Sequence, residues 1–588
     1  MIQSRRTTQY SPFARKWIEM WRIWFFLLIL LIAFLFVLYA YFQIQIVRGA
    51  ELAKSAESQY IRRNTDEDRG TIYFTTKTGD IISAAVQQER YKVAIIPKNI
   101  KTNERAIELY NLLAEITEMD RDDFIKKALT DDPYEEIAHG LFKEDINFLK
   151  EDPVKEVGVY SDRVRTYPAG KTAAHVLGFV AYDDSGDRGG RYGLEEFYDE
   201  ELSRERTSSH VNIFAEVFAD LKVLISDDHF EGDIITTIEP TVQKEVEKQI
   251  ARAVGVWDAR EAGGIIINPQ NGEIIAMVAL PDFDVNNFSD YSPESFRNPF
   301  STKVFEMGSI MKPLVMAIGF DQGAVGPETR FYDPGFIKVG KHTIHNFDER
   351  GRGDVTMTEV LQQSLNTGMV TVMQHLKHDT VRKYFADLGV GKRTGIDLPS
   401  ELSGLTSNLD SNRDIEFANI SFGQGVALTP IAIVRALSML ANGGYDVTPH
   451  LAREIVYVNG LRDAPFAADI VRTDETPRVF KESTVDDISR ILVGVVDKEL
   501  QNGEKSMERY NIAAKTGTAQ IPSPDGGYYG DRHLHTFFGY FPAYQPDFLI
   551  FLFLNEPKNV KYSSQTLFDP FMEITKFLIS YYNIPPDR

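Results

Sequence analysis

The sequence predicts an α+β protein in which helices flank a largely antiparallel sheet, preceded by a mixed α/β domain and by one membrane-spanning helix. Its 588 residues are too many for one ordinary hydrophobic core, so we expect two or more domains. Strand-like and helix-like segments follow one another in the C-terminal half, and two of the strands flank a hairpin turn signal. One N-terminal run is almost wholly apolar, although the whole chain, at 43% hydrophobic and 25% charged, has a globular composition.

The apolar run is long enough to cross a bilayer. Residues 23–47 carry no charge, and at ~1.5 Å per residue the 20 residues of 23–42 span the ~30 Å hydrocarbon layer. A buried core helix is rarely apolar on every face over this length, and a cleaved signal peptide is shorter and ends in an A-x-A site. Five basic residues against one acidic residue precede the run, and such a flank stays in the cytoplasm. We therefore expect a cytoplasmic tip at 1–22, a single-pass anchor at 23–47, and the remaining chain outside the membrane.

Composition also excludes several kinds of chemistry. The chain has no cysteine, so a thiolate nucleophile, a disulfide, and zinc–thiolate or cysteine-held iron–sulfur sites are impossible. Its net charge of −21 argues against non-specific binding to nucleic acid, which needs a basic surface to displace counterions. Covalent chemistry must then use a hydroxyl, an amine or a carboxylate, and we expect neither a cofactor nor a metal.

Residues 48–235 are expected to form the mixed α/β domain, which contains no nucleotide-binding loop and no metal-ligand spacing. Strand-rich runs alternate with turn residues from Thr71 to Pro97, and residues 101–156 have the pattern of acidic helices. Two loop-rich clusters follow at 165–180 and 189–202. Nothing in this stretch indicates catalysis.

Residues 236–588 are expected to form the second domain, in which helices pack against the sheet. The predicted helices are 241–254, Ser309–Phe320, Thr356–Met373 and Pro430–Ala441. The predicted strands are a hairpin pair within 263–280, which turns at residues 270–272, and three segments at 512–520, 535–543 and 548–554. The last segment has only seven apolar residues, so it is a core strand and not a second membrane span.

The first chemical motif in this domain is Ser309-Ile-Met-Lys312, the only S-x-x-K in the chain. Three residues apart on a helix, the two side chains lie on one face within reach of each other. Gly308 precedes the serine, so the hydroxyl can sit at a helix N-terminus, where free N–H groups favour negative charge. Lys312 can take the proton of Ser309 only if burial lowers its pKa. Alone, the pair fits a solvated helix surface equally well.

Two further motifs follow in the chain. Ser364-Leu-Asn366 is the only S-x-N, and its side chains can relay a proton and hydrogen-bond a substrate amide. K-T-G occurs twice, at Lys77 in a polar turn and at Lys515, which directly follows the start of an apolar strand. In the second copy the lysine and the threonines, Thr516 and Thr518, can hold a carboxylate, and Gly517 lets a substrate backbone approach the strand. We predict that the second copy is functional and that the first is only a turn.

The three motifs in this order are typical of penicillin-binding proteins and of class A β-lactamases. The surrounding sequence resembles class B, monofunctional penicillin-binding proteins over roughly residues 60 to 575. The segments that carry this resemblance are EMGSIMKP, ITTIEPTVQ, TGIDLPSELSG, ISFGQGVALTP and AAKTGTAQ, together with RTYPAGKTAAHVLGFV and YGLEEFY, which resemble the family's N-terminal pedestal. The resemblance implies a serine β-lactamase-like catalytic fold at 236–588 and a non-catalytic, dimerisation-type pedestal at 48–235.

The resemblance also implies the reaction and the roles in it. The protein would be a bacterial D,D-transpeptidase that cross-links peptidoglycan stem peptides and that β-lactams acylate. Ser309 would be the acylated nucleophile and Lys312 its general base, with Ser364 and Asn366 assisting. The donor's terminal carboxylate would be held by Lys515, Thr516, Gly517 and Thr518, and the backbone N–H groups of Ser309 and Thr518 would form the oxyanion hole.

Several alternatives remain beside this interpretation. A class A β-lactamase would carry an E-x-E-L-N motif, which is absent here, and that family lacks a pedestal. A D,D-carboxypeptidase differs from a transpeptidase only in its acceptor, and an inactive cell-wall scaffold is a more distant alternative. TGIDLPSELSG and SFGQGVALTP favour the septal, division-type branch over an elongation-type enzyme.

The same resemblance implies partners and a location. The sequence contains no recognisable glycosyltransferase domain, so the glycan strands would come from a SEDS-type glycosyltransferase partner, contacted by the anchor and pedestal, with other division or cell-wall proteins. The expected location is the bacterial cytoplasmic membrane, with the N-terminus in the cytoplasm and the catalytic domain outside it.

Overall fold

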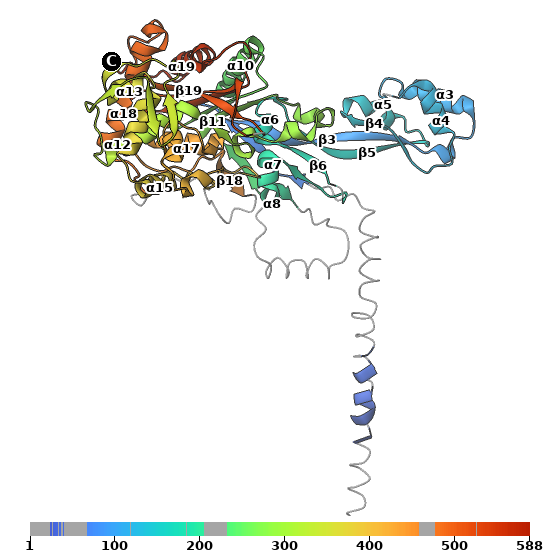
Figure 1. The fold of residues 1–588 in the computed structure, drawn as a ribbon. Coiled ribbons are helices and arrows are strands. Elements are labelled where there is room, and N and C mark those ends of the chain that lie inside the picture. The colour runs from blue at the N-terminus through green and yellow to red at the C-terminus, as the bar shows by residue number, and fades with distance from the viewer. Residues whose placement is uncertain are drawn as a thin grey trace, which may run out of the picture. The chain divides into compact units, whose positions relative to one another are not determined.

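The computed structural model describes residues 68–204 except 118 and 184, residues 232–457, residues 477–588 except 525, and scattered positions between 24 and 39. Most of the predicted anchor, 23–47, therefore lies outside the described residues, as does the whole cytoplasmic tip. Of the helices in the described part, none is both long enough and apolar enough to cross a membrane. The described residues from 68 onward belong to one compact unit (Figure 1).

A five-stranded antiparallel sheet forms the centre of the C-terminal part of this unit. Its strands, in spatial order, are β11 (Ile274–Leu280), β10 (Glu261–Ile267), β21 (Phe548–Asn555), β20 (Tyr528–Phe541) and β19 (Ala513–Pro522). The predicted hairpin pair and the three predicted C-terminal strands are all confirmed. Every residue of the apolar segment 548–554 is buried, as expected for a core strand. Among the strands of the described residues, β19 pairs only with β20, so its other edge is left open there.

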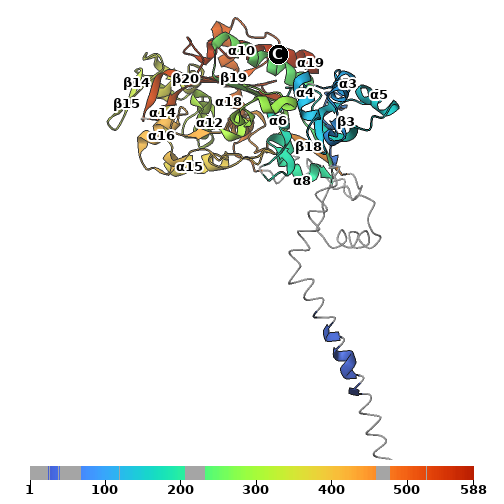
Figure 2. The ribbon, with the colours of Figure 1, turned by 90° about the vertical axis from the view of Figure 1, so that its right-hand side faces the viewer.

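Helices cover both faces of this sheet, as the α+β prediction requires. Figure 2 shows α10 (Pro240–Trp257) and α19 (Phe568–Tyr582) on one face, and α12 (Lys312–Asp321) and α18 (Glu482–Gly494) on the other. The remaining helices of at least six residues beside them are α13 (Met357–Gln362), α14 (Asn366–Gln374), α15 (His378–Asp387), α16 (Asp414–Ile420) and α17 (Pro430–Ala441).

The predicted helix Pro430–Ala441 has the predicted bounds, and its cap is visible in the structure. The Thr429 side chain accepts a hydrogen bond from the Ala432 backbone N–H, and Pro430 occupies the first turn, where no N–H is needed. The predicted helix Thr356–Met373 is wrong as one element, because the chain leaves the helical conformation between α13 and α14. That break contains Ser364, whose φ of +58° no helix interior accommodates.

A second sheet joins the two halves of the chain. Its strands run in the order β18 (Ala452–Tyr457), β9 (Gly232–Thr236), β2 (Ile72–Thr75), β3 (Ile81–Ile95) and β4 (Glu135–Leu141), and β5 (Val157–Thr166) also pairs with β3. The predicted boundary near residue 236 falls at the end of β9, a strand that pairs with β2 before it and with β18 after it. One hydrophobic core accordingly includes side chains from both halves, such as Ile72 and Ile455.

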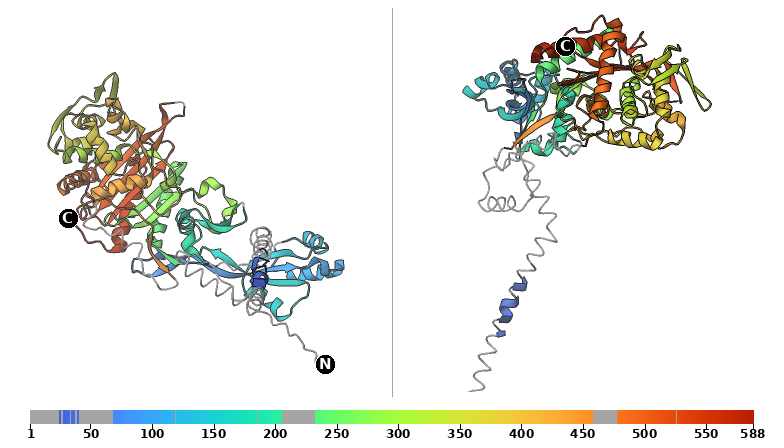
Figure 3. Two further views of the ribbon diagram at one scale, coloured as in Figure 1. Left: turned by 90° about the horizontal axis from the view of Figure 1, so that it is seen from below. Right: turned by 90° about the vertical axis from the view of Figure 1, so that its left-hand side faces the viewer.

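The long strand β3 leads to a distal lobe with its own core. Figures 1 and 3 show β3 and β5 extending away from the large sheet toward α3 (Asn103–Leu113), α4 (Arg121–Ala128) and α5 (Asn147–Glu151). The core here includes Leu109, Phe124 and Ile146, all fully buried. The helices predicted in 101–156 are thus confirmed, although β4 interrupts them.

The two loop-rich clusters of the N-terminal half pack against each other. They contain β6 (Phe179–Tyr182), β7 (Arg188–Arg191), and the short helices α6 (Ala174–Leu177), α7 (Gly193–Phe197) and α8 (Asp199–Leu202). The carboxylate of Glu195 is fully buried and accepts hydrogen bonds from Arg69 Nε at 2.6 Å and Arg165 Nε at 2.7 Å. Two cations therefore compensate one buried anion, and these contacts join β1 (Asp68–Arg69) to both clusters.

Candidate active site

The predicted nucleophile lies in a tight turn beside the open edge of the sheet. Ser309 belongs to a short 3₁₀ segment, Gly308–Met311, which continues directly into α12. The Ser309 side chain is half-buried, whereas the residues on both sides of it are buried. The turn therefore leaves the Ser309 hydroxyl partly accessible, while the residues on both sides of Ser309 are buried.

Glycines let this turn pack closely against its neighbours. Gly308 has φ +63°, and an added Cβ would lie 3.0 Å from Thr518 O in β19. An added Cβ at Gly517 would lie 2.2 Å from Thr536 Oγ1 and 2.9 Å from Met307 O. From the sequence we predicted that Gly517, which has no side chain, lets a substrate backbone approach the strand closely. In the structure, the space beside it is filled by β20 and by the turn that carries Ser309, so glycine is required here by packing.

Lys312 lies at the centre of the site and is completely buried. Its Nζ donates hydrogen bonds to Ser364 O at 2.7 Å and to Asn366 Oδ1 at 2.7 Å, and lies 3.1 Å from Ser364 Oγ. Burial, and secondly the nearby charge of Lys515, hold the pKa of Lys312 well below its usual value. A neutral amine has two N–H donors and one lone pair. When the carbonyl and the amide oxygen use both donors, the lone pair faces Ser364 Oγ and can accept a proton.

The second lysine contacts the same hydroxyl. Lys515, which is 1% exposed, extends from β19 so that its Nζ lies 3.0 Å from Ser364 Oγ and 3.2 Å from Thr516 O. Burial lowers the pKa of Lys515 to about 7. Ser364 Oγ therefore bridges Lys312 and Lys515 and can pass a proton between them or to a bound group.

The backbone around the S-x-N motif is held by a buried polar network that the sequence did not predict. Asn366, the first residue of α14, donates from Nδ2 to His345 O at 3.0 Å. The next residue, Thr367, donates to Asp333 Oδ1 at 2.8 Å, and Asn346 Nδ2 donates to Asp333 Oδ2 at 2.9 Å. These three partners are almost completely buried. No local sequence signal marks them, because they come from three separate segments.

The threonines of the second K-T-G copy lie on the edge strand. Thr518 Oγ1 accepts a hydrogen bond from Ser563 N at 3.1 Å, so its own proton remains available to a ligand. Thr516 and Thr518 are both half-buried, unlike Lys515 and Gly517 between and beside them. The structure therefore gathers the predicted residues of all three motifs at one place, beside an unpaired strand edge.

The first K-T-G copy is the predicted turn between β2 and β3. Gly79 has φ +87°, and Lys77 Nζ donates to Tyr581 O at 2.9 Å at the surface. It shares no contact with the other motifs in the described part of the chain.

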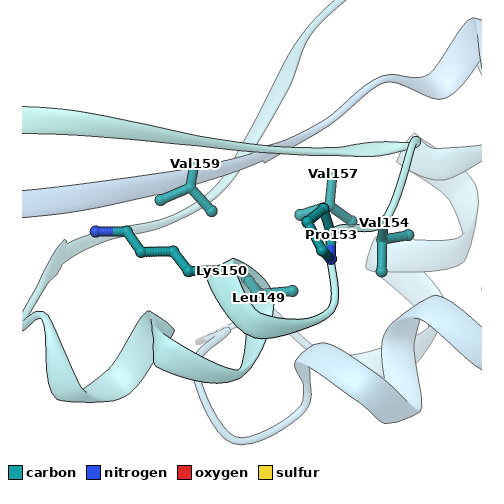
Figure 4. A pocket seen from close by; sticks show the side chains of 6 residues that line it. All are labelled: Leu149, Lys150, Pro153, Val154, Val157 and Val159. Atoms are coloured by element: carbon teal, nitrogen blue, oxygen red, sulfur yellow. The ribbon is translucent and has the colours of Figure 1, made fainter.

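Two cavities in the described part of the chain are lined by no residue of these motifs. One cavity of about 320 Å³ in the distal lobe is lined by Leu149, Lys150, Pro153, Val154, Val157 and Val159 (Figure 4). Its walls are apolar apart from one lysine, so it offers no catalytic group. Among the described residues, no cluster of three or more histidine, aspartate or glutamate side chains is arranged to hold a metal ion.

Comparisons with protein families agree with the motifs. A family model described as the penicillin binding protein transpeptidase domain matches residues 262–573, and one described as the penicillin-binding protein dimerisation domain matches residues 65–215. The first match covers more than half of the chain and includes all three motifs.

Individual proteins are similar over most of their length. Stage V sporulation protein D of Bacillus subtilis (strain 168) is 29% identical over 547 residues, which are 91% of this chain and 82% of that protein. Peptidoglycan D,D-transpeptidase FtsI of Escherichia coli (strain K12) is 28% identical over 444 residues, 75% of this chain and 71% of that one. The solved apo-form of penicillin binding protein 3 from Mycobacterium tuberculosis aligns with a TM-score of 0.62 at 26% identity and covers 73% of this chain and 92% of its own.

Proposed function

The chain belongs to the class B penicillin-binding protein family, and from this membership we propose that it joins peptidoglycan stem peptides by D,D-transpeptidation through an acyl-enzyme on Ser309. The observation that carries the assignment of roles is the convergence of Lys312 and Lys515 on Ser364 Oγ, at 3.1 Å and 3.0 Å. Such a convergence supplies one neutral base and one cation around a single relay hydroxyl.

The first half-reaction transfers an acyl group to the enzyme. Ser309 Oγ attacks the carbonyl carbon of the D-Ala–D-Ala bond while its proton passes to the lone pair of Lys312 Nζ. The C–N bond then breaks, and the departing D-Ala amine receives a proton through Ser364 Oγ. Lys515 and the threonines beside it attract the terminal carboxylate of the donor, and backbone N–H groups of Ser309 and Thr518 stabilise the oxyanion.

The second half-reaction regenerates the free hydroxyl of Ser309. An acceptor amine on a neighbouring strand attacks the ester carbonyl, its proton passes to Lys312, and Ser309 Oγ leaves with a proton as the new amide forms. The two half-reactions together consume neither water nor an oxidant or reductant. A β-lactam acylates the same hydroxyl, because the attack of Ser309 Oγ on the lactam carbonyl breaks the ring C–N bond, forms an ester and leaves the ring nitrogen protonated.

Labelling with a fluorescent penicillin tests this assignment. Ser309→Ala should abolish the covalent adduct, whereas Ser407→Ala, at an exposed serine, should leave it unchanged. The two K-T-G copies provide a second matched pair. We expect Lys515→Ala to slow acylation by about 10²-fold or more, as loss of an electrostatic catalyst does, and Lys77→Ala to leave it unchanged. An adduct that survives Ser309→Ala would disprove the assignment.

The labelling assay does not show whether an amine or water takes the acyl group from Ser309. Analysis of the reaction products distinguishes the two acceptors. With a D-Ala–D-Ala donor and an added acceptor amine, a transpeptidase yields the cross-linked amide together with free D-Ala. Free D-Ala with only the hydrolysed donor would favour the D,D-carboxypeptidase alternative.

We further propose a septal, division-type role for this enzyme, at the cytoplasmic membrane and beside a SEDS-type glycosyltransferase. The segments TGIDLPSELSG and SFGQGVALTP support the division-type branch, and the uncharged run 23–47 supports the anchor. Depletion of the protein should reduce incorporation of new wall at the septum and spare the lateral wall. Loss of lateral incorporation instead would assign it to elongation.

Deletion of residues 1–47 tests the anchor separately. The truncated protein should move from the membrane pellet to the soluble fraction of a cell lysate, while its labelling by penicillin persists. Retention in the pellet would contradict an N-terminal anchor.

A further inference from the structure

One buried carboxylate near the S-x-N motif takes no part in the chemistry above. Asp333 is the last residue of β13 (Arg330–Asp333), a strand that pairs with β16 (Gly353–Thr356), and it is 1% exposed. Burial of a charge is costly unless hydrogen bonds compensate it. The groups that donate to Asp333 therefore show what this carboxylate holds in place.

Among the described residues, four hydrogen-bond donors converge on Asp333, and each donor is an uncharged group. Oδ1 accepts from Thr367 Oγ1 at 2.8 Å and from Gly335 N at 2.9 Å. Oδ2 accepts from Asn346 Nδ2 at 2.9 Å and from Arg352 N at 3.0 Å. Hydrogen bonds to an ionised acceptor are stronger than those between neutral groups. Asp333 thus holds three loop positions and the first turn of α14 at one point.

Two of these donors, Asn346 and Thr367, also contact each other, and together with Asp333 they form a buried unit that we call the Asp333 network. An ionised carboxylate only accepts hydrogen bonds, so Asn346 must turn its Nδ2 toward Asp333 and its Oδ1 toward Thr367. That Oδ1 accepts from Thr367 N at 3.2 Å and lies 3.1 Å from Thr367 Oγ1. The first N–H groups of a helix have no partner within the helix, and Asn346 supplies one here. The network therefore fixes the start of α14.

Two residues that directly precede members of the network carry the contact to the general base. Asn366 precedes Thr367 in the chain, and His345 precedes Asn346. Asn366 Nδ2 donates to His345 O at 3.0 Å, and because a carbonyl oxygen only accepts, the amide must turn this end toward His345. The other end of the amide, Oδ1, then faces Lys312 Nζ at 2.7 Å. The network thus sets the orientation of the Asn366 amide from both sides.

The orientation of this amide decides what Lys312 can do. With Asn366 Oδ1 toward Nζ, the amide and the Ser364 carbonyl take both N–H donors of the neutral amine, and the lone pair faces Ser364 Oγ. A reversed amide would present its own N–H donors to Nζ and occupy the lone pair that accepts the proton. Acylation therefore requires Asn366 to keep the orientation seen here.

We propose that Asp333 is a positioning residue for acylation. Through its network it holds the Asn366 amide with Oδ1 toward Lys312, so that the lone pair of Lys312 stays available for the proton of Ser309. This inference rests on the proposed function. Binding of the donor carboxylate should be independent of Asp333, because the groups that attract the carboxylate belong to β19 and none of the four donors does.

Stopped-flow kinetics of penicillin acylation measure the role of the carboxylate. Asp333→Asn replaces one acceptor oxygen by an amide NH2, so the donors on that side lose their partner and the network loosens. We expect the rate constant at saturating penicillin to fall about 10- to 100-fold, as it does when catalytic groups are slightly misplaced. The penicillin concentration that gives half the maximal rate should change by less than about twofold, because β19 is undisturbed. A purely structural role would lower the free energy of unfolding without changing the rate constant of the folded protein.

Thr367→Val and Thr367→Ser form a matched pair that leaves the carboxylate in place. Valine has the shape of threonine without its hydroxyl, so Thr367→Val should slow acylation about tenfold, the equivalent of one lost hydrogen bond. Serine keeps the hydroxyl, so Thr367→Ser should retain most of the rate. Thr371, one turn later in α14, donates its hydroxyl to Thr367 O at 3.0 Å within the helix, and Thr371→Val should therefore leave the rate constant unchanged.

A surface variant and a double variant complete the experiment. Asp354 in β16 is exposed and pairs with Arg330, so Asp354→Asn should change neither kinetic parameter. The combined effect of Asp333→Asn and Thr367→Val should be smaller than the product of the two single effects, because both break the same contact. An unchanged rate constant in folded Asp333→Asn and Thr367→Val, or equal rates for the valine and serine variants, would overturn the positioning role. Absence of acylation in the unmodified protein and in every variant would contradict the proposed function instead.

Discussion

At the scale of single residues, the site depends on two lysines that share one buried pocket. Lys312 and Lys515 are both nearly inaccessible to water, and each meets the hydroxyl of Ser364. Two adjacent ammonium groups without water are unfavourable, so one lysine gives up its proton more easily. Lys312, which also feels the charge of Lys515, has its pKa lowered well below the usual value, and Lys515 titrates at about 7. The pocket therefore holds one base and one acid near neutral pH.

This pair predicts a bell-shaped pH dependence of acylation. Lys312 acts as a base only when it is neutral, so the rate should fall as pH drops below its lowered pKa. Lys515 attracts a carboxylate only when it is protonated, so the rate should also fall as pH rises through about 7. Stopped-flow acylation by a penicillin, followed from above pH 7 down to the acid limit of the folded protein, measures both limbs.

Lys515→Arg provides the matched variant for this profile. Arginine keeps its proton throughout the accessible range, so the alkaline limb should move up or disappear while the acidic limb remains. An alkaline limb that stays near pH 7 in this variant would show that another group controls it.

At the scale of elements, the sequence patterns predicted helices and strands well where the pattern was local. The hairpin of β10 and β11 and the cap of α17 follow from periodicity and from turn and cap residues. The break between α13 and α14 did not follow, because Ser364 adopts φ +58° only to place its carbonyl and hydroxyl on Lys312. Such a conformation is costly in isolation and persists only because the surroundings fix it.

The packing of β19 against the nucleophile turn gives an element-scale prediction. Gly517→Ala places a Cβ 2.2 Å from Thr536 Oγ1 in β20 and 2.9 Å from Met307 O in the turn before Ser309. Both neighbours must shift, so the free energy of unfolding should fall by about 1–3 kcal/mol and acylation should slow. Chemical denaturation and penicillin labelling measure the two effects.

An open glycine on a helix serves as the control. An added Cβ at Gly255 in α10 meets no atom within 4 Å, so Gly255→Ala should stabilise the protein by about 0.5–1 kcal/mol through helix propensity. If Gly517→Ala is as stable and as active as the unmodified protein, the close packing inferred at β19 is incorrect.

At the scale of the whole molecule, sequence segments far apart meet between the N-terminal and C-terminal parts of the compact unit. Tyr198, in the YGLEEFY segment, donates its hydroxyl to Asp397 Oδ2 at 3.0 Å, and Asp397 lies in the TGIDLPSELSG segment. Asp397 also accepts from Leu451 N at 2.7 Å and Ala452 N at 2.6 Å, beside β18. One buried carboxylate thus connects the N-terminal part of the unit to two segments of its C-terminal part.

Removal of one hydroxyl tests this connection. Tyr198→Phe leaves a buried carboxylate short of one donor, so the free energy of unfolding should fall by about 1–3 kcal/mol. Tyr182→Phe, at a tyrosine that is 71% exposed, should have almost no effect. Urea denaturation of both variants provides the comparison, and equal stability of the two would contradict a structural role for the Tyr198–Asp397 contact.

The sequence by itself determined the kind of chemistry and the local elements. Absence of cysteine, one S-x-x-K, and a K-T-G behind an apolar strand start were enough to select a serine and a lysine, because residue type and short spacing depend only on the chain nearby. Only the tertiary structure decided that Lys312 bonds to Ser364 and Asn366 and that Gly517 packs closely against Thr536 and Met307. The two contacts of Lys312 join residues 52 and 54 positions apart, and packing between such segments leaves no periodic signal in the sequence.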